Sequence, residues 1–201
     1  MLLDVDDCQL VLVDFQEKLM PAIHEHALVS ANAVRLAKIA RMMEVPVFGT
    51  EQNPQKLGAN LSELRELCDR TLPKMSFSAA ADGLIDWLQP PAKPQQGRNA
   101  RSLPKHLQKP VQAEPERATI VIAGCEAHIC LLQTALELLE AEMDVWVVTD
   151  ACGSRTERNR DAAFDRLAGA GAELVTTEMV AYEWLRSCEH PAFKEMLALV
   201  K

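Results

Sequence analysis

The stretch from Ala118 to Glu142 constrains the fold more than any other part of the chain. Thr119–Ala123 is a nearly all-apolar, β-branched run, which is typical of a strand buried on both faces. Gly124 ends this run, and the leucines and alanines that follow recur at helical spacing. The sequence therefore predicts a buried strand, a tight turn and an amphipathic helix.

Cys130 falls in the first turn or so of that predicted helix, at the carboxyl end of the strand. The positive end of a helix dipole favours thiolate over thiol, and the thiolate is the nucleophile. Strand–turn–helix junctions are also where exposed nucleophiles tend to be held. A buried, inert cysteine is the alternative interpretation, and it is the more common fate of a lone cysteine.

The same alternation of strand and helix patterns continues along the chain. Strands are expected at Gln9–Val13, Pro46–Thr50, Arg70–Lys74, Asp144–Thr149 and Glu173–Thr176, in addition to Thr119–Ala123. The main helices are expected at His26–Met43, Ala79–Leu88, Asn159–Ala170, Glu178–Cys188 and Pro191–Val200. This order predicts an α/β domain with a parallel sheet of about six strands, covered by helices on both faces.

A Pro-rich insertion at about 89–117 interrupts this single predicted domain, which spans residues 1–201. The insertion carries six prolines and almost no apolar periodicity. It is longer than the usual connection inside a compact domain. Two interpretations stay open: a solvated insert, or a locally basic arm that docks on a neighbouring subunit.

Composition excludes several classes of protein. The formal net charge of −8 argues against nucleic acid and anionic membranes as partners. The acidic residues near Met1 do not fit a signal peptide, and no apolar run reaches the length of a membrane span. Six scattered cysteines then indicate free thiols in a reducing compartment, so a cytoplasmic location is expected. Neither a GxGxxG nor a P-loop motif occurs, and no cofactor is predicted.

Three chemically distinct residues lie at the carboxyl ends of predicted strands: Asp14, Lys74 and Cys130. Ligand sites of parallel sheets lie beyond the carboxyl ends of the strands. Together these residues offer a base, a fixed cation and a nucleophile. Taken singly, each residue has an ordinary structural explanation. Asp14 could cap a helix or turn, Lys74 could be a solvated surface residue, and Cys130 could belong to the core.

Six motifs occur in a characteristic order: VLVDFQEKLMP, TEQNP–LG, LPKMSFSA, GCEAHICLLQTA, VVTDACGSR and AGAELVTTE. Together they resemble the isochorismatase-like cysteine hydrolase superfamily, in particular the isochorismatase domain-containing proteins with a GxEAHxC-type motif. The resemblance covers nearly the whole chain apart from the insertion. It implies a three-layer α/β/α fold with a Rossmann-like parallel sheet.

The resemblance also implies a catalytic triad of Asp14, Lys74 and Cys130. In such enzymes the cysteine attacks an amide-type carbonyl, a thioester acyl-enzyme forms, and water releases the acid. The resemblance further implies a cis peptide bond at Cys125–Glu126 and an oxyanion hole built from the N–H groups of Glu126 and Cys130.

Three further side chains are assigned to the substrate-binding region. Gln16 is expected to orient the nearby carboxylate of Asp14. Gln52 and Phe77 are expected as walls of the pocket.

Departures from related branches narrow the prediction. The metal cluster of the nicotinamidase branch is replaced here by TEQNPQKLG, which has no histidine, so no metal site is expected. True isochorismatases lack the cysteine, so isochorismate is not the expected substrate. The predicted function is a metal-independent cysteine hydrolase that cleaves a C–N amide-type bond of a small molecule. The resemblance also implies a homo-oligomer, a dimer or larger. The alternatives are a non-catalytic binding or scaffold protein and a thiol-based redox role.

Overall fold

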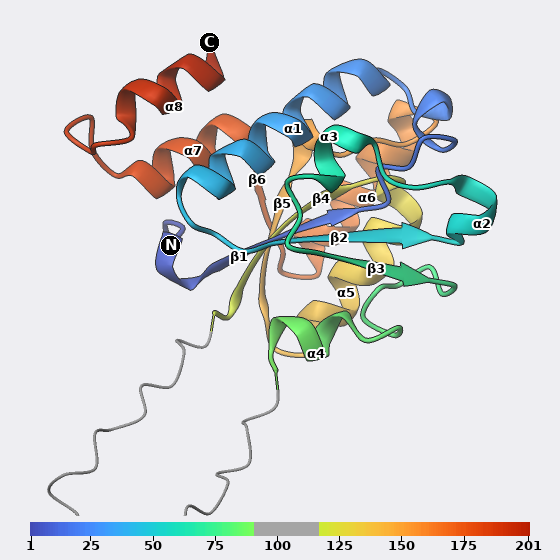
Figure 1. Cartoon of the computed structure of the whole chain (residues 1–201). Helices are drawn as coiled ribbons and strands as arrows, with labels where there is room; N and C mark the ends of the chain where they lie inside the picture. Colours follow the sequence, from blue (N-terminus) through green and yellow to red (C-terminus); the bar gives the residue numbers. More distant parts are fainter. Residues whose placement is uncertain (91–116) are drawn as a thin grey trace, which may run out of the picture.

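The computed structural model describes residues 1–90 and 117–201. Six parallel strands form one sheet: β1 (Cys8–Val13), β2 (Val47–Gln52), β3 (Arg70–Lys74), β4 (Thr119–Gly124), β5 (Asp144–Val148) and β6 (Glu173–Val175). Their order across the sheet is β3-β2-β1-β4-β5-β6 (Figure 1). The chain therefore builds outward from β1 in one direction and from β4 in the other. The boundary between β1 and β4 is the topological switch point, where open α/β sheets bind ligands.

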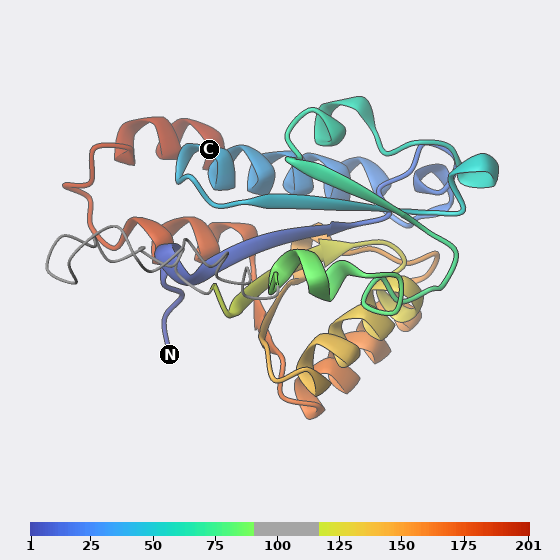
Figure 2. The same ribbon diagram turned by 60° about the horizontal axis from the view of Figure 1, so that its bottom comes forward.

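Helices cover both faces of the sheet and make three layers (Figure 2). On one face α1 (His26–Met42) packs against α7 (Thr177–Leu185) and α8 (Phe193–Val200). On the other face α5 (Leu132–Glu140) packs against α6 (Glu157–Gly169). The three-layer, Rossmann-like fold implied by the sequence is confirmed.

The central strands are apolar because both of their faces are covered. Every residue of β1 and of β4 is buried. On α1, Val29, Ala33, Leu36, Ala37 and Ala40 recur at helical spacing and face the core. This spacing is the pattern of an amphipathic helix packed on a sheet.

Three short helices follow β2 and β3 along the chain. They are α2 (Pro54–Leu57), α3 (Ser62–Arg65) and α4 (Leu84–Leu88). The first lies within the TEQNPQKLG segment, directly after β2. The last is shorter than the predicted Ala79–Leu88 helix, because Gly83 has a φ of +103° and residues 79–83 form turns.

Gly124 allows β4 to end in close contact with β1. It has a φ of +157°, and a Cβ atom built on it would lie 2.4 Å from the carbonyl oxygen of Val13. The next residue, Cys125, donates its N–H to that same oxygen at 2.9 Å. A glycine is therefore required where the chain leaves β4 toward Cys130.

Gln9 joins the two chain segments that border the predicted insertion. Its side-chain amide nitrogen donates to the carbonyl oxygen of Leu88 at 3.0 Å and to that of Arg117 at 2.7 Å. Most of the insertion lies outside the described residues, so both of its proposed roles stay predictions. No helix in residues 1–90 and 117–201 is long and apolar enough to cross a membrane.

Candidate active site

Asp14 and Lys74 form a fully buried ion pair at the carboxyl edge of the sheet. Asp14 directly follows β1, and Lys74 is the last residue of β3. The Lys74 Nζ atom lies 2.8 Å from Asp14 Oδ2, and both side chains are 0% exposed. Buried charged side chains are tolerated when they are paired and hydrogen-bonded, as these two are.

Lys74 crosses the intervening strand β2 to reach Asp14, and β2 supports both partners. Thr50 donates its hydroxyl to Asp14 Oδ1 at 2.7 Å. Gln52 accepts from Lys74 Nζ at 2.9 Å. The strand register places Thr50 beside Val13 and Gln52 beside Lys74, so both contacts follow from strand pairing.

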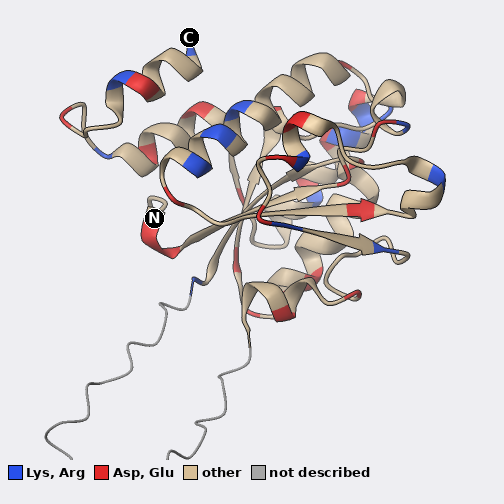
Figure 3. Ribbon diagram, in the orientation of Figure 1, with Lys and Arg blue, Asp and Glu red and all other residues tan. Residues whose placement is uncertain are grey.

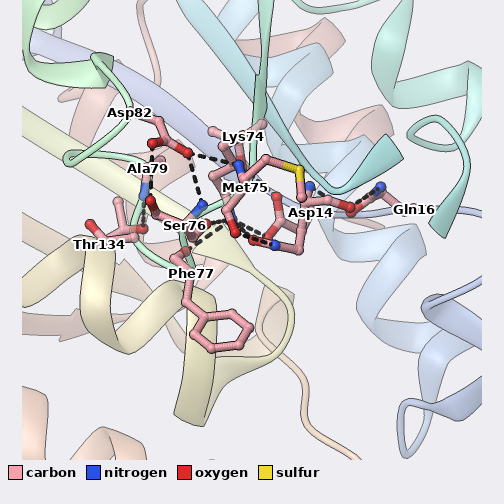
Figure 4. A network of polar contacts seen from close by, with 12 residues as sticks. Asp14, Gln16, Lys74, Met75, Ser76, Phe77, Ala79, Asp82 and Thr134 are labelled. Carbon is pink, nitrogen blue, oxygen red and sulfur yellow. Dashed lines mark hydrogen bonds and ion pairs between the residues drawn. The ribbon is translucent and has the colours of Figure 1, made fainter. Parts of the chain in front are cut away.

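The loop after β3 completes the surroundings of the ammonium group (Figure 4). Lys74 Nζ also lies 2.9 Å from the carbonyl oxygen of Phe77 and 3.3 Å from that of Ser76. With Asp14 and Gln52, four oxygen atoms surround a group with three hydrogens. This arrangement fixes the position of the positive charge.

Cys130 lies on the π-helix Ala127–Leu131, between β4 and α5. Asp14 and Lys74 lie near its thiol, and the charges of both act on the pKa of that thiol. These three residues, spread over more than a hundred positions of the sequence, therefore meet at the switch point between β1 and β4.

The resting state of Cys130 is the neutral thiol. Burial, reinforced by the charge of Asp14 and partly offset by that of Lys74, raises the pKa of Cys130 to about 12. The sequence predicts a thiolate stabilised by a helix end and a cation, whereas burial and the Asp14 carboxylate raise the pKa of the thiol despite the cation. A nucleophilic role consequently requires that a neighbouring base removes the thiol proton.

Access to the sulfur is narrow. Cys130 is 5% exposed. Beside the loop after β3 lies a surface depression lined by Asn53, Pro54, Gln55, Pro73, Lys74, Met75 and Asp82, and Cys130 does not line it. Any molecule that reacts with Cys130 must present a small, unhindered group.

The segment between β4 and the helix of Cys130 is defined by its peptide bond at Cys125–Glu126 and by the contacts of Glu126. The Cys125–Glu126 peptide bond is cis, as the resemblance implied. The N–H of Glu126 donates no hydrogen bond to another group within residues 1–90 and 117–201. The buried Glu126 carboxylate accepts from the backbone N–H of Arg155 at 3.2 Å and from its Nε at 2.8 Å.

Gln16 and Gln52 are engaged with the protein itself. The Gln16 side chain donates to the carbonyl oxygens of Gln52 and Gly58 at 3.0 and 2.7 Å. It also accepts from the backbone N–H of Gln52 at 2.9 Å. Gln52 donates to the carbonyl oxygen of Met75 at 2.8 Å while it accepts from Lys74. Thr50, rather than Gln16, contacts the Asp14 carboxylate.

Phe77 and Met75 are among the few large apolar side chains that are exposed. Phe77 is 54% exposed and Met75 70%. The ring of Phe77 points away from the Asp14–Lys74 pair (Figure 4). Phe77 therefore lies at the outer rim of this region.

His128 belongs to the same π-helix, but both of its ring nitrogens have other partners. Nδ1 lies 2.9 Å from the Ser154 hydroxyl, and Nε2 lies 3.3 Å from the Asn159 side-chain amide. In the described part of the chain, no group of three or more His, Cys, Asp or Glu side chains is arranged to hold a metal ion.

The fold and site define a doubly wound α/β protein with an acid, an amine and a thiol at its switch point. The isochorismatase domain family model matches residues 8–179. Isochorismatase domain-containing protein 2 from Homo sapiens is 35% identical over 192 residues, covering 96% of this chain and 82% of that protein. The protein of the same description from Rattus norvegicus is 33% identical, with 96% and 80% covered.

Solved structures agree with this relationship. The MAR1 ribonuclease structure from Caenorhabditis elegans has a TM-score of 0.82 and 28% identity, covering 100% of this chain and 92% of that chain. YcaC from Pseudomonas aeruginosa has a TM-score of 0.79 and 25% identity, covering 98% and 91%. The chain belongs to the isochorismatase family, and this membership supports a hydrolase-type role.

Proposed function

We propose that this protein is a metal-independent cysteine hydrolase that cleaves a C–N amide-type bond of a small molecule. The observation that carries the proposal is the buried Asp14–Lys74 pair at the carboxyl edge of the sheet, whose two charges act on the pKa of the nearby Cys130 thiol. A nucleophile, a base and a fixed cation are the groups that acyl transfer requires. Metal independence is supported by the absence of histidine from the TEQNPQKLG segment.

In the first half-reaction, Asp14 removes the thiol proton as the sulfur attacks the carbonyl carbon of the substrate. A carbon–sulfur bond forms, and the carbonyl π electrons move to oxygen. When the tetrahedral intermediate collapses, the carbon–nitrogen bond breaks and the nitrogen takes the proton from Asp14. Ammonia or an amine leaves, and Cys130 is held as a thioester.

In the second half-reaction, a water molecule attacks the thioester carbon. Asp14 accepts a proton from this water and returns it to the sulfur when the carbon–sulfur bond breaks. The acid leaves and the thiol is restored. Lys74 stabilises the negative charge that moves between Asp14 and the sulfur, and this attraction is strong because the pair is fully buried.

We assign the oxyanion hole to the backbone N–H groups of Glu126 and Cys130. The proposal is supported by the N–H of Glu126, which has no acceptor among the described residues and lies next to the helix that carries the thiol. A donor of this kind contributes roughly 3–4 kcal/mol to lowering the barrier. Arg155 holds the Glu126 side chain and so fixes this segment.

Gln16, Gln52 and Phe77, the residues assigned to substrate binding, have different roles in this proposal. Gln16 and Gln52 support the site from within the protein, because the side chain of Gln16 holds the carboxyl end of β2 and that of Gln52 holds Lys74. Phe77 offers an apolar surface at the rim. The narrow access to Cys130 favours a terminal carboxamide or ureide-like group, whose carbonyl has little bulk beside it.

Two relatives bear on the chemistry. The Pseudomonas YcaC structure contains covalent acrylamide, which is a small electrophilic amide. That structure supports the idea that a protein of this fold can react with a small amide. The ribonuclease activity named for the Caenorhabditis structure is not adopted, because this chain has a net charge of −8 and its described basic residues are interspersed with acidic ones (Figure 3).

The test is a screen of small carboxamides and ureides with detection of released ammonia. We expect the wild-type protein to release ammonia from at least one compound. Cys130→Ala should abolish the release, and Cys188→Ala, which changes an exposed thiol, should not alter it. A rate that persists in the Cys130→Ala variant contradicts the proposal. Binding of a compound without any turnover supports the non-catalytic alternative instead.

The homo-oligomer and the cytoplasmic location stay predictions. Size-exclusion chromatography with light scattering tests the first. Microscopy of a tagged chain in its own cells tests the second.

A further inference from the structure

The backbone of the Met75–Phe77 loop forms one side of the Lys74 environment. The carbonyl oxygens of Ser76 and Phe77 both face the ammonium group. Side chains of these residues play no part in that contact. The position of the positive charge therefore depends on how this short loop is folded.

Asp82 holds the opposite side of the same loop (Figure 4). Its Oδ2 atom accepts the backbone N–H of Met75 at 2.8 Å and that of Ser76 at 2.9 Å. Its Oδ1 atom accepts the hydroxyl of Ser76 at 3.0 Å. Ser76 is thus bound by Asp82 through its N–H and hydroxyl, while its carbonyl points to Lys74.

The Asp82 carboxylate is suited to this role because it stays ionised. The hydrogen bond from the Ser76 N–H, together with that from Met75, holds the pKa of Asp82 below its usual range. Hydrogen bonds to a charged acceptor are stronger than those to a neutral one. The loop is therefore well fixed although Asp82 itself is partly exposed.

Two contacts with α5 anchor the chain between the loop and Asp82. The backbone N–H of Ala79 donates to the Thr134 hydroxyl at 3.0 Å, and the Ser78 hydroxyl donates to Glu137 at 2.7 Å. The helix α5 directly follows the π-helix that carries Cys130. The loop and the thiol are consequently attached to the same continuous helical segment.

We propose that Asp82 is a positioning residue, which fixes Lys74 against Cys130 by folding the Met75–Phe77 loop. This inference rests on the proposed function, since it concerns the same thiol and amine. The effect of Asp82 passes through the backbone carbonyl groups of Ser76 and Phe77. Sequence patterns do not reveal this role, because Asp82 lies in a segment whose apolar spacing predicts a helix.

The test compares three variants that each remove one negative charge: Asp82→Ala, Asp82→Asn and Asp86→Ala. Asp86 is the matched control, because it is exposed on α4 and makes no side-chain hydrogen bond within the described residues. In Asp82→Asn, the side-chain oxygen can accept both N–H groups as Oδ2 does, and the amide nitrogen can donate to the Ser76 hydroxyl.

The measurement is the rate at which iodoacetamide labels Cys130 relative to the exposed Cys188 in the same molecule, followed by peptide mass spectrometry. We expect Asp82→Ala to lower this ratio about tenfold, which corresponds to a rise of about one unit in the pKa of the thiol. Asp82→Asn should stay within about threefold of wild type, and Asp86→Ala should equal it.

An unchanged or increased ratio in Asp82→Ala overturns the proposal, since the loop would then only cover the thiol. Equal losses in Asp82→Ala and Asp82→Asn also overturn it, because charge rather than hydrogen bonding would be responsible. Circular dichroism and urea unfolding check that each variant is folded. If Asp82→Ala does not fold, Asp82→Ser takes its place, because a serine hydroxyl is too short to accept both N–H groups.

A Lys74→Met variant separates this inference from the proposed function. Labelling of Cys130 that falls in Lys74→Met but not in Asp82→Ala refutes the role of Asp82 alone. Labelling that is insensitive to Lys74→Met refutes the coupling of amine and thiol on which the proposed function depends.

Discussion

The Asp14–Lys74 pair allows a prediction that does not depend on knowing the substrate. Replacing Lys74 by Met keeps a similar length of side chain but removes the charge. The Asp14 carboxylate, which is 0% exposed, then keeps the hydroxyl of Thr50 as its side-chain hydrogen-bond partner among the described residues. Removing one partner of a buried ion pair costs about 3–5 kcal/mol, because an uncompensated charge stays behind.

Replacing Asp14, the other partner of the pair, should lower the free energy of unfolding by less. In Asp14→Asn, the Lys74 ammonium retains Gln52 and the carbonyl oxygens of Ser76 and Phe77, which together can accept all of its hydrogens. We expect a loss of about 3 kcal/mol, at the low end of the cost of removing a counter-ion from a buried charge, because these oxygens still accept its hydrogens. The double variant should be less destabilised than the sum of the two single variants, because no unpaired carboxylate remains.

The assay is equilibrium unfolding in urea, followed by tryptophan fluorescence and circular dichroism. The stability of a domain is typically about 5–15 kcal/mol, so Lys74→Met is expected to lower the midpoint strongly without preventing folding. If Lys74→Met costs less than about 1 kcal/mol, or if Asp14→Asn costs more than Lys74→Met, then the buried pair does not have the energetic role argued from its contacts.

Three further predictions concern the surroundings of the site. Burial raises the pKa of the Cys130 thiol to about 12 from an ordinary value of 9.0. The contribution of this thiol to the free energy of unfolding is therefore fully present below pH 9 and is lost as the pH rises toward 12. The Cys130→Ala variant lacks this thiol, so its free energy of unfolding should fall less steeply with pH than that of wild type, by roughly 1.4 kcal/mol per pH unit above about pH 9. The same slope in both proteins, measured by urea unfolding at each pH, would contradict this. Thr50→Val should cost about 1.5–3 kcal/mol, because it removes a hydrogen bond to a buried carboxylate; an equal midpoint in urea would show that the hydroxyl is dispensable. Gly124→Ala should lower the free energy of unfolding by about 1–3 kcal/mol or more, since the added Cβ lies 2.4 Å from a carbonyl oxygen; thermal unfolding that matches wild type would refute the need for glycine.

Much of the fold can be predicted from the sequence because its signals are local. The apolar β-branched runs of the six strands stand between helix patterns, and each predicted strand corresponds to an observed one within two residues at either end. The helix expected at Ala79–Leu88 begins only at Leu84. Its first half is diverted by Gly83 and by the side chain of Asp82, which binds the loop before it.

Sequence reasoning identifies some residues of the candidate site and misses the roles of others. Asp14, Lys74 and Cys130 are identified through family resemblance, since spacing alone cannot bring such distant residues together. The role of Thr50 escapes sequence reasoning because it depends on the register between β1 and β2. The protonation state of Cys130 also escapes it, because that state depends on how deeply the thiol is buried.

The two hydrogen bonds of Gln9 have a consequence for peptides inserted into this domain. They join the chain just before and just after the segment 91–116, at the amino-terminal edge of the sheet and thus at the end opposite Asp14 and Cys130. Since one side-chain amide holds both flanking segments at that end, we expect a tag or a foreign peptide inserted into this segment to leave the reactive groups at the other end in place.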